Sequence, residues 1–282
     1  MPTDPVISVK GLLKRYGERI AVHDVDLEVA RGEVFALLGP NGAGKTTTVE
    51  ILEGHRCPTA GRARVLGVDP VKGDARWRAR LGMVVQSSHL TDELTVEEVV
   101  GHFATYYPSP RSPDEVIELV GLTEQRNQRL RSLSGGQQRR VEVALGMVGR
   151  PELLFLDEPT TGFDPEARRR FWDLIDALAS EGTTIVLTTH YLEEAERLAD
   201  RVGVIVAGRI VAIGPPATLA GRHRAASVVR WREAGRTVEH ATDRPTAFVL
   251  ELSSRLGGEI PGLTIARPTL EDVYLEMIGA AA

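Results

Sequence analysis

A glycine-rich run that ends in lysine and threonine, from Gly39 to Thr46, has residue types and spacing suited to holding phosphate groups. Glycines allow the backbone to turn successive N–H groups inward, and a helix that follows adds positive potential at its N-terminus. Lys45 offers an ammonium for the β- and γ-phosphates, and Thr46 offers a hydroxyl for Mg²⁺. An apolar strand before the run and a helix after it favour this Walker A interpretation over a chance glycine-rich turn. The residues expected to contact ATP here are Gly39, Pro40, Asn41, Gly42, Ala43, Gly44, Lys45, Thr46 and Thr47.

Two acids follow an apolar run further along the chain, where Leu153–Leu156 leads into Asp157 and Glu158. Acids at the carboxyl end of a buried strand lie where α/β sheets bind ligands. We expect Asp157 to bind Mg²⁺ and Glu158 to orient or deprotonate the attacking water. The alternative is a solvated strand end, which the loop upstream makes less favourable.

His190 also follows a predicted strand, Thr183–Thr189, and so is expected at the same edge of the sheet. A single histidine in such a place commonly caps or packs. In combination with the phosphate loop and the acid pair, its imidazole is expected to contact the γ-phosphate or the attacking water.

A second anion-binding helix start is predicted at Leu133–Gln137, in the order Leu-Ser-Gly-Gly-Gln. Ser134 would cap the helix, and two glycines leave the backbone N–H groups bare. One nucleotide has one γ-phosphate, yet this chain has two phosphate-binding helix starts. A dimer in which each chain caps the ATP of the other would use both. The residues expected to contact nucleotide here are Ser134, Gly135, Gly136 and Gln137.

The elements that would position these residues alternate between strands and helices. This alternation predicts a mostly parallel sheet with helices on both faces. After Gly214-Pro215-Pro216 the pattern changes to short strands and two helices, which predicts a small α+β domain. We therefore expect two domains, residues 1–220 and 221–282. The main predicted elements are strands over 6–9, 25–29, 33–38, 83–85, 153–156 and 183–189, and helices over 45–52, from 95, 134–147, 167–180 and 192–199.

The composition is that of an ordinary globular protein, with 42% hydrophobic and 26% charged residues among 282. The net charge of −5 lacks the basic footprint of a nucleic-acid-binding protein. One cysteine, Cys57, excludes an internal disulfide, suits a reducing cytosol and is expected to be a small buried residue. We expect no signal peptide and no membrane span, because the apolar stretch 202–213 is interrupted by glycine and arginine.

Over residues 6–215 the sequence resembles the nucleotide-binding subunit of an ABC transporter. The resemblance implies an α/β fold of the P-loop NTPase type, with a mostly parallel core, an antiparallel N-terminal sheet and a helical signature subdomain. Tyr16 resembles the aromatic residue that stacks on adenine, although a core tyrosine of the N-terminal sheet is the alternative. Gln86 resembles the glutamine that senses Mg²⁺ and contacts the membrane subunit. Leu133–Gln137 resembles the signature, and His190 resembles the switch histidine.

The segment 161–164 resembles the D-loop, in which Asp164 would contribute to the nucleotide site and Phe163 replaces the usual leucine. Gly208–Gly214 and Arg267–Tyr274 are similar to ATPase subunits of the daunorubicin-resistance type, which pair with separate type-2 permeases. The alternative for the last helix is that it only packs within the C-terminal domain.

This resemblance implies an exporter ATPase that closes head to tail around two Mg-ATP and drives a separate permease. Its partners would be a second copy or a paired ATPase subunit and the permease, with no direct nucleic acid. It would lie in the cytoplasm at the inner face of the cell membrane, and the cargo would be a drug or a hydrophobic metabolite. The alternatives are an ABC-type ATPase that acts on ribosomes or DNA, and an importer ATPase with a regulatory tail.

Overall fold

A computed structural model describes residues 4–84, 93–224, 226–233 and 235–281. These residues form two compact units, 1–211 and 212–282. The predicted division at 220/221 falls inside the second unit and stays a prediction.

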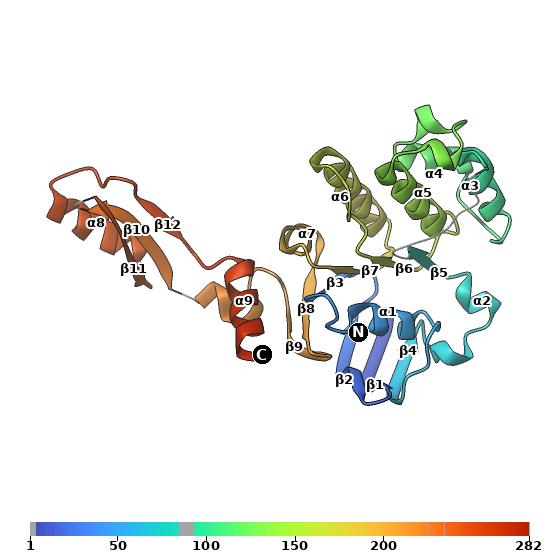
Figure 1. Ribbon diagram of the computed structural model, residues 1–282, viewed down its shortest axis with the longest axis horizontal. Helices are drawn as coiled ribbons and strands as arrows, with labels where there is room; N and C mark the ends of the chain where they lie inside the picture. Colours follow the sequence, from blue (N-terminus) through green and yellow to red (C-terminus); the bar gives the residue numbers. More distant parts are fainter. Residues whose placement is uncertain (1–3, 85–92, 225, 234, 282) are drawn as a thin grey trace. The chain divides into compact units, whose positions relative to one another are not determined.

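A six-stranded sheet forms the centre of the first unit (Figure 1). Its inner strands are buried along their whole length, which explains their continuous apolar sequences. Five of the strands run parallel, so their carboxyl ends share one edge. In spatial order the strands are β5 (Leu81–Val84), β6 (Leu153–Asp157), β7 (Thr184–Thr189), β3 (Val34–Leu38), β8 (Arg201–Val206) and β9 (Arg209–Gly214).

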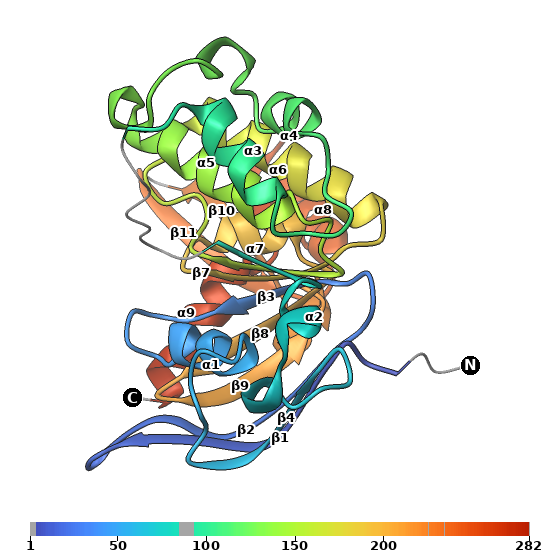
Figure 2. The same ribbon diagram turned by 90° about the vertical axis from the view of Figure 1, so that its right-hand side faces the viewer.

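Helices cover both faces of this sheet, as the alternating pattern predicts. Figures 1 and 2 show α1 (Lys45–Leu52) on one face, and α5 (Gly135–Met147), α6 (Pro165–Ser180) and α7 (Leu192–Leu198) on the other. The helical part around α5 also contains α3 (Val96–Ala104) and α4 (Pro113–Leu119). The short helices are η1 (Pro70–Lys72), α2 (Ala75–Arg78), η2 (Thr123–Gln125) and η3 (Leu130–Ser132).

An antiparallel sheet of order β2-β1-β4 combines two strands before the phosphate loop with one strand after α1. Its core side is apolar, with Val22, Val25 and Leu12 fully or almost fully buried. Its strands are β1 (Ile7–Tyr16), β2 (Arg19–Val29) and β4 (Ala60–Val65). The mostly parallel core, antiparallel N-terminal sheet and helical subdomain of the ABC fold are thereby confirmed.

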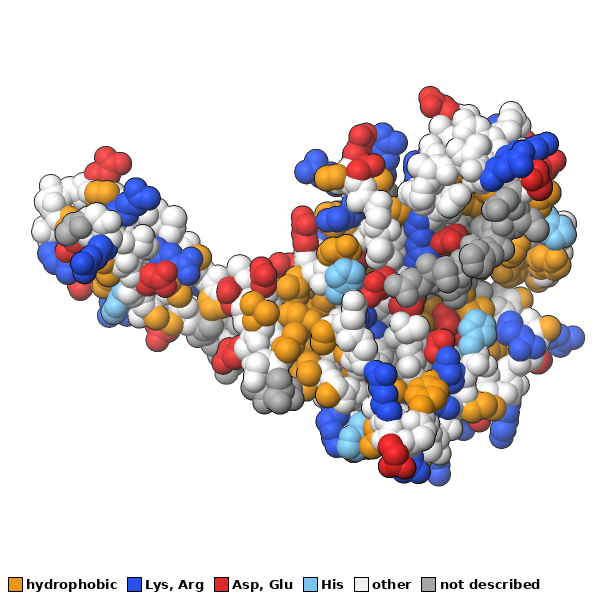
Figure 3. Space-filling view, viewed as in Figure 1, with side chains coloured by type: hydrophobic (Ala, Val, Ile, Leu, Met, Phe, Trp, Pro, Cys, Tyr) orange, Lys and Arg blue, Asp and Glu red, His pale blue; other side chains and the backbone are white. Residues whose placement is uncertain are grey.

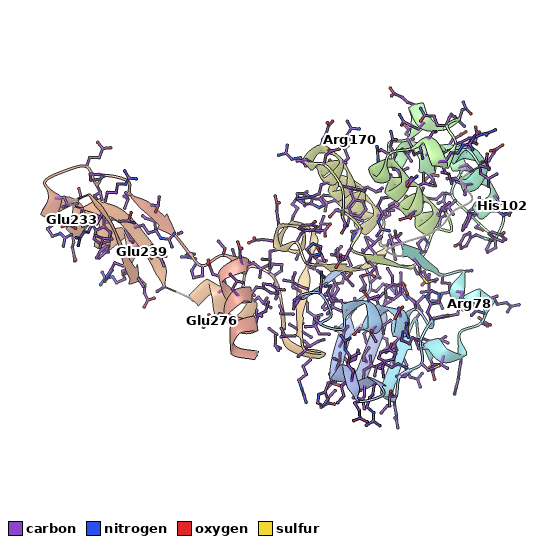
Figure 4. The ribbon with its side chains drawn as sticks, in the orientation of Figure 1. Arg78, His102, Arg170, Glu233, Glu239 and Glu276 are labelled. Atoms are coloured by element: carbon purple, nitrogen blue, oxygen red, sulfur yellow. The ribbon has the colours of Figure 1, made fainter. Side chains whose placement is uncertain are left out.

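The second unit packs one helix on a three-stranded antiparallel sheet of order β11-β10-β12. Its core contains Val229, Trp231, Leu252 and Ile260. Figure 4 shows Glu233 and Glu239 on the two longer strands of this sheet. The elements are η4 (Leu219–Arg224), β10 (Ser227–Glu233), β11 (Arg236–Thr242), α8 (Pro245–Leu256), β12 (Thr264–Ala266) and α9 (Leu270–Ala281).

The surface is of mixed charge, and Figure 3 shows cationic and anionic side chains interspersed on the face it presents. Arg170 lies on the outer part of α6, exposed and paired with Glu166 (Figure 4). Cys57 is exposed, so its predicted burial is wrong. It lies in the turn between α1 and β4, where its carbonyl accepts a hydrogen bond from Lys14. None of the described helices has the length and apolar character needed to span a bilayer.

Candidate active site

The phosphate loop joins β3 to α1, and close packing determines its shape. A Cβ on Gly39 would lie 2.4 Å from the carbonyl oxygen of Ile205 in β8. A Cβ on Gly44 would lie 2.3 Å from the carbonyl oxygen of Ala21 in β2. Gly44 also caps α1 at a φ of +105°. Both positions therefore require glycine, because a side chain would collide with backbone.

Lys45 is the first residue of α1, and its ammonium is buried beneath the loop. Its Nζ donates to the carbonyl oxygen of Gly39 at 2.8 Å and to that of Pro40 at 3.3 Å. The same atom lies 3.5 Å from Oε1 of Glu158. The side chain thus links the loop to the carboxyl end of β6.

Thr46 and Asp157 lie together, although 111 positions separate them in the sequence. The Thr46 hydroxyl donates to Oδ2 of Asp157 at 3.1 Å, and Thr188 on β7 donates to Oδ1. A hydroxyl and a carboxylate are the hard oxygen ligands that suit Mg²⁺, which is commonly held by one or two protein groups plus phosphate and water. Among the described residues no cluster of three or more His, Cys, Asp or Glu could hold a metal ion.

Glu158 follows β6 in a left-handed backbone conformation, with a φ of +47°. Such a conformation costs a non-glycine residue about 1–3 kcal/mol and persists only where the surroundings enforce it. Its N–H donates to the carbonyl oxygen and to the hydroxyl of Thr188, both at 3.1 Å. Nδ1 of His190, after β7, lies 3.3 Å from Oε1 of Glu158. The structure therefore brings together the predicted acids, lysine and histidine.

A cavity of about 640 Å³ opens beside this cluster. Tyr16 lies at its wall and is 40% exposed, which excludes the alternative of a core tyrosine. Arg56 lies with its guanidinium 5.3 Å from the centre of the Tyr16 ring, and it pairs with Glu50. The cavity is lined by Tyr16, Arg19, Ala21, Asn41, Gly42, Gly44, Lys45, Thr46, Thr47, Arg56 and Glu158.

Arg19 and Arg56 were not predicted from the sequence. Arginine is the common cation of this chain, so neither residue stood out by type. Their position at the cavity depends on the register of β1 with β2 and on the turn after α1.

The second predicted anion site is a separate hollow of about 330 Å³ at the start of α5. Ser134 and Gln137 form a capping box. The Ser134 hydroxyl accepts from the N–H of Gln137 at 3.3 Å, and the Gln137 side-chain oxygen accepts from the N–H of Ser134 at 2.8 Å. The lining is Ser134, Gly135, Gly136, Gln137, Arg140, Gly162, Phe163, Asp164 and Ala167, and it has no residue in common with the first cavity.

The D-loop residues contribute to this second hollow. Asp164 caps α6 by accepting from the N–H groups of Ala167 at 2.8 Å and Glu166 at 2.9 Å. The N–H of Ala167, followed by that of Glu166, holds the pKa of the Asp164 carboxyl below its usual range. Phe163 is buried and packs edge-on against Phe171, with ring centroids 5.9 Å apart. Its bulk in place of leucine thus anchors the loop on α6.

Of the predicted site residues, Gln86 lies outside the described part of the chain. Besides Arg19 and Arg56, two further contributors were missed. Thr188 donates to the Asp157 carboxylate and accepts from the N–H of Glu158, and the buried guanidinium of Arg139 donates to the carbonyl oxygen of Asp157 at 2.6 Å. The only signal for Arg139 was its place in the helix after the Ser-Gly-Gly-Gln run.

The parallel sheet, phosphate loop and strand-end acids define the class of P-loop ATPases. Residues 22–161 match the family model described as ABC transporter. A daunorubicin resistance ATP-binding protein, DrrA3, of Streptomyces coeruleorubidus is 38% identical over an alignment that covers 98% of this chain and 96% of that protein. A Nod factor export ATP-binding protein I of Ralstonia nicotianae is also 38% identical, over 98% of this chain and 94% of the relative.

Solved structures agree with these relatives. The ATP-binding cassette MJ0796, in a dimeric post-hydrolysis state bound to ADP and Pi, has a TM-score of 0.68 and 25% identity, and the match covers 74% of this chain and 98% of that one. An ATP-binding subunit of an ABC transporter has a TM-score of 0.72 and covers 96% of this chain and 99% of that one at 24% identity, which shows the shared fold. This chain belongs to the ATP-binding subunits of ABC transporters, and it is an ATPase.

Proposed function

We propose that this chain hydrolyses ATP within a head-to-tail dimer and drives export through a separate membrane permease. The observation that carries the proposal is that the two predicted phosphate-binding helix starts line two separate hollows of one chain. One contains Lys45, and the other begins at Ser134. A P-loop enzyme that works alone has no use for the second, whereas two antiparallel copies would pair each loop with the signature of the partner.

The contacts at the carboxyl ends of β6 and β7 support distinct roles. Lys45 would bind the β- and γ-phosphates, while Thr46 and Asp157 would hold Mg²⁺, which neutralises phosphate charge during transfer. Glu158 would take a proton from the water that attacks the γ-phosphorus as the bond to the β-phosphate oxygen breaks. His190, within 3.3 Å of Glu158, would orient the same water or the γ-phosphate. Tyr16 would stack on adenine.

Export is supported by the relatives, whose names describe daunorubicin resistance and Nod factor export. Those relatives align with nearly the whole chain, including the C-terminal segment. The cargo class we propose is a drug or a hydrophobic metabolite. The partners would be a second copy or a paired ATPase subunit, together with a permease that holds this chain at the inner face of the membrane. Residues 221–282 would then be an accessory domain of the subunit.

The dimer is tested by mixing two inactive variants. Ser134→Ala and Lys45→Ala chains, when combined, form one composite site with both parts intact and one with both parts lost. In a one-to-one mixture that pairs at random, about half of the dimers are mixed, and each mixed dimer has one intact site of two. We therefore expect the mixture to recover up to about a quarter of the wild-type ATPase activity, because each variant supplies what the other lacks. The matched control is Ser132→Ala, two positions before Ser134. Among the described residues, the Ser132 hydroxyl donates only to the carbonyl oxygen of Arg129. A mixture no more active than either variant alone would contradict the head-to-tail arrangement.

A further inference from the structure

Arg139 is a buried cation on α5, two residues after the Ser-Gly-Gly-Gln run. The residue is 8% exposed. Burying an ionised guanidinium is costly unless hydrogen bonds and an opposite charge compensate, so its contacts reveal what the position does.

Its donors reach the turn that carries Glu158. Nη2 donates to the carbonyl oxygen of Asp157 at 2.6 Å, and Nε donates to that of Pro159 at 3.2 Å. Nη2 also lies 3.5 Å from the carbonyl oxygen of Glu158. Nη1 bonds Glu142 one turn further along the helix, at 2.6 Å, which balances the charge.

The Glu158 turn is therefore held from two directions. Thr188, on the neighbouring strand β7, accepts the N–H of Glu158 and bonds the Asp157 carboxylate. Arg139, on α5, donates to the carbonyl oxygens of Asp157 and Pro159, the residues on either side of Glu158. Because Glu158 has a φ of +47°, its backbone would relax without such support. The guanidinium thus helps to determine where the Glu158 carboxylate lies.

The same helix begins at the second predicted anion site. α5 begins at Gly135, with Ser134 as its cap, and Arg139 lies in its second turn. The helix is continuous between the two, and its far end is anchored by buried apolar residues such as Val141 and Met147.

We propose that Arg139 is a positioning residue that links the signature helix to Glu158 of the same chain and holds the turn that carries this carboxylate in place for hydrolysis. This inference rests on the proposed head-to-tail dimer, in which Ser134 caps the nucleotide bound by the partner chain while Glu158 acts on the nucleotide bound by its own.

The first test compares kinetic constants. In Arg139→Met we expect kcat to fall by about 10- to 100-fold, because a displaced carboxylate misplaces the attacking water. KM for ATP should stay within about twofold, since the phosphate loop is untouched. Arg139→Lys keeps a cation that can reach fewer carbonyls and should recover part of kcat. Arg111→Met removes an equally buried arginine that bonds Glu115 and Glu181 instead, and controls for general destabilisation. Equal losses of kcat in the Arg139 and Arg111 variants would overturn the proposal.

The second test asks which site Arg139 serves. In the mixture of Lys45→Ala and Ser134→Ala chains, the working site uses Glu158 of the Ser134→Ala chain. Arg139→Met added to that chain should abolish most of the recovered activity, whereas the same change in the Lys45→Ala chain should leave it. Loss in both placements, or in neither, would overturn the role of Arg139. A failure of the dimer itself is recognised separately, because the mixture with Arg139 intact would then recover no activity.

Discussion

The buried ammonium of Lys45 and the partly buried carboxylate of Glu158 form an ion pair, with Nζ 3.5 Å from Oε1. Nδ1 of His190 lies 3.3 Å from the same oxygen. The phosphate loop, the end of β6 and the end of β7 thus converge on one carboxylate oxygen. Removing the charge of Glu158 should therefore affect mainly hydrolysis, whereas removing the neighbouring Lys45 ammonium should affect mainly ATP binding.

Glu158→Gln is expected to keep ATP binding and to lower the rate of hydrolysis by about 10²-fold or more, because the amide cannot accept the proton of the attacking water. The variant should accumulate an ATP-bound dimer, seen by light scattering of the size-separated protein with and without nucleotide. Glu193→Gln, at an exposed carboxylate on α7, is the control. Turnover near that of the wild type would remove Glu158 from the role of general base.

Lys45→Ala is expected to weaken ATP binding by about 10²-fold, which corresponds to about 2.7 kcal/mol. We expect this loss because the buried ammonium, which donates to the carbonyl oxygen of Gly39 in the loop, would bind the phosphates. Titration calorimetry with a non-hydrolysable ATP analogue measures the effect. Lys10→Ala, at an exposed position of β1, should bind normally. An unchanged affinity in Lys45→Ala would exclude this lysine from phosphate binding.

Local sequence predicted the parts of this site that a single element determines. Continuous apolar runs indicated β3 and β6 because these strands are buried on both faces. The helix cap at Ser134 followed from residue type. The strand β4 was missed, since most of its side chains are exposed and show no alternation.

Contacts between residues of different elements could not be predicted from the sequence. Thr188 meets Asp157 because β7 pairs with β6 in parallel register, which no local pattern specifies. Arg139 meets the Glu158 turn because α5 packs over the sheet, and nothing in its own helix marks it as different from Arg140. Arg140 turns to the carbonyl oxygen of Gly121 instead, at 2.9 Å.

Mg²⁺ removal is expected to stop hydrolysis, and Asp157→Asn should raise the Mg²⁺ concentration for half-maximal ATPase activity by about tenfold or more. The carboxylate lies 3.1 Å from the Thr46 hydroxyl, and replacing it with an amide removes the charge that balances the cation. Activity is measured across a Mg²⁺ titration, with Asp243→Asn as an exposed control. A midpoint that does not move in Asp157→Asn would argue against this residue as a ligand.

Glu53 lies at the end of α1, and we expect its ionisation to lower the free energy of unfolding as pH rises. Burial, followed by the charges of Asp157 and Glu50, raises the pKa of its carboxyl from 4.5 to about 8. His55 faces it, with Nδ1 3.3 Å from Oε2. Because the folded state holds this proton more tightly than the unfolded state, its stabilising contribution is complete below about pH 4.5 and is lost as pH rises through about 8.

Glu53→Gln removes this dependence, because the amide is neutral at every pH. The melting temperature of the variant relative to wild type should therefore rise between pH 5 and pH 8, with a free-energy difference that grows by up to about 1.4 kcal/mol per pH unit. Circular dichroism melts at several pH values within this window measure it. Glu124→Gln, an exposed glutamate in η2, is the matched control and should show a constant offset. A constant offset in Glu53→Gln as well would mean that Glu53 is ionised in the folded protein throughout this range.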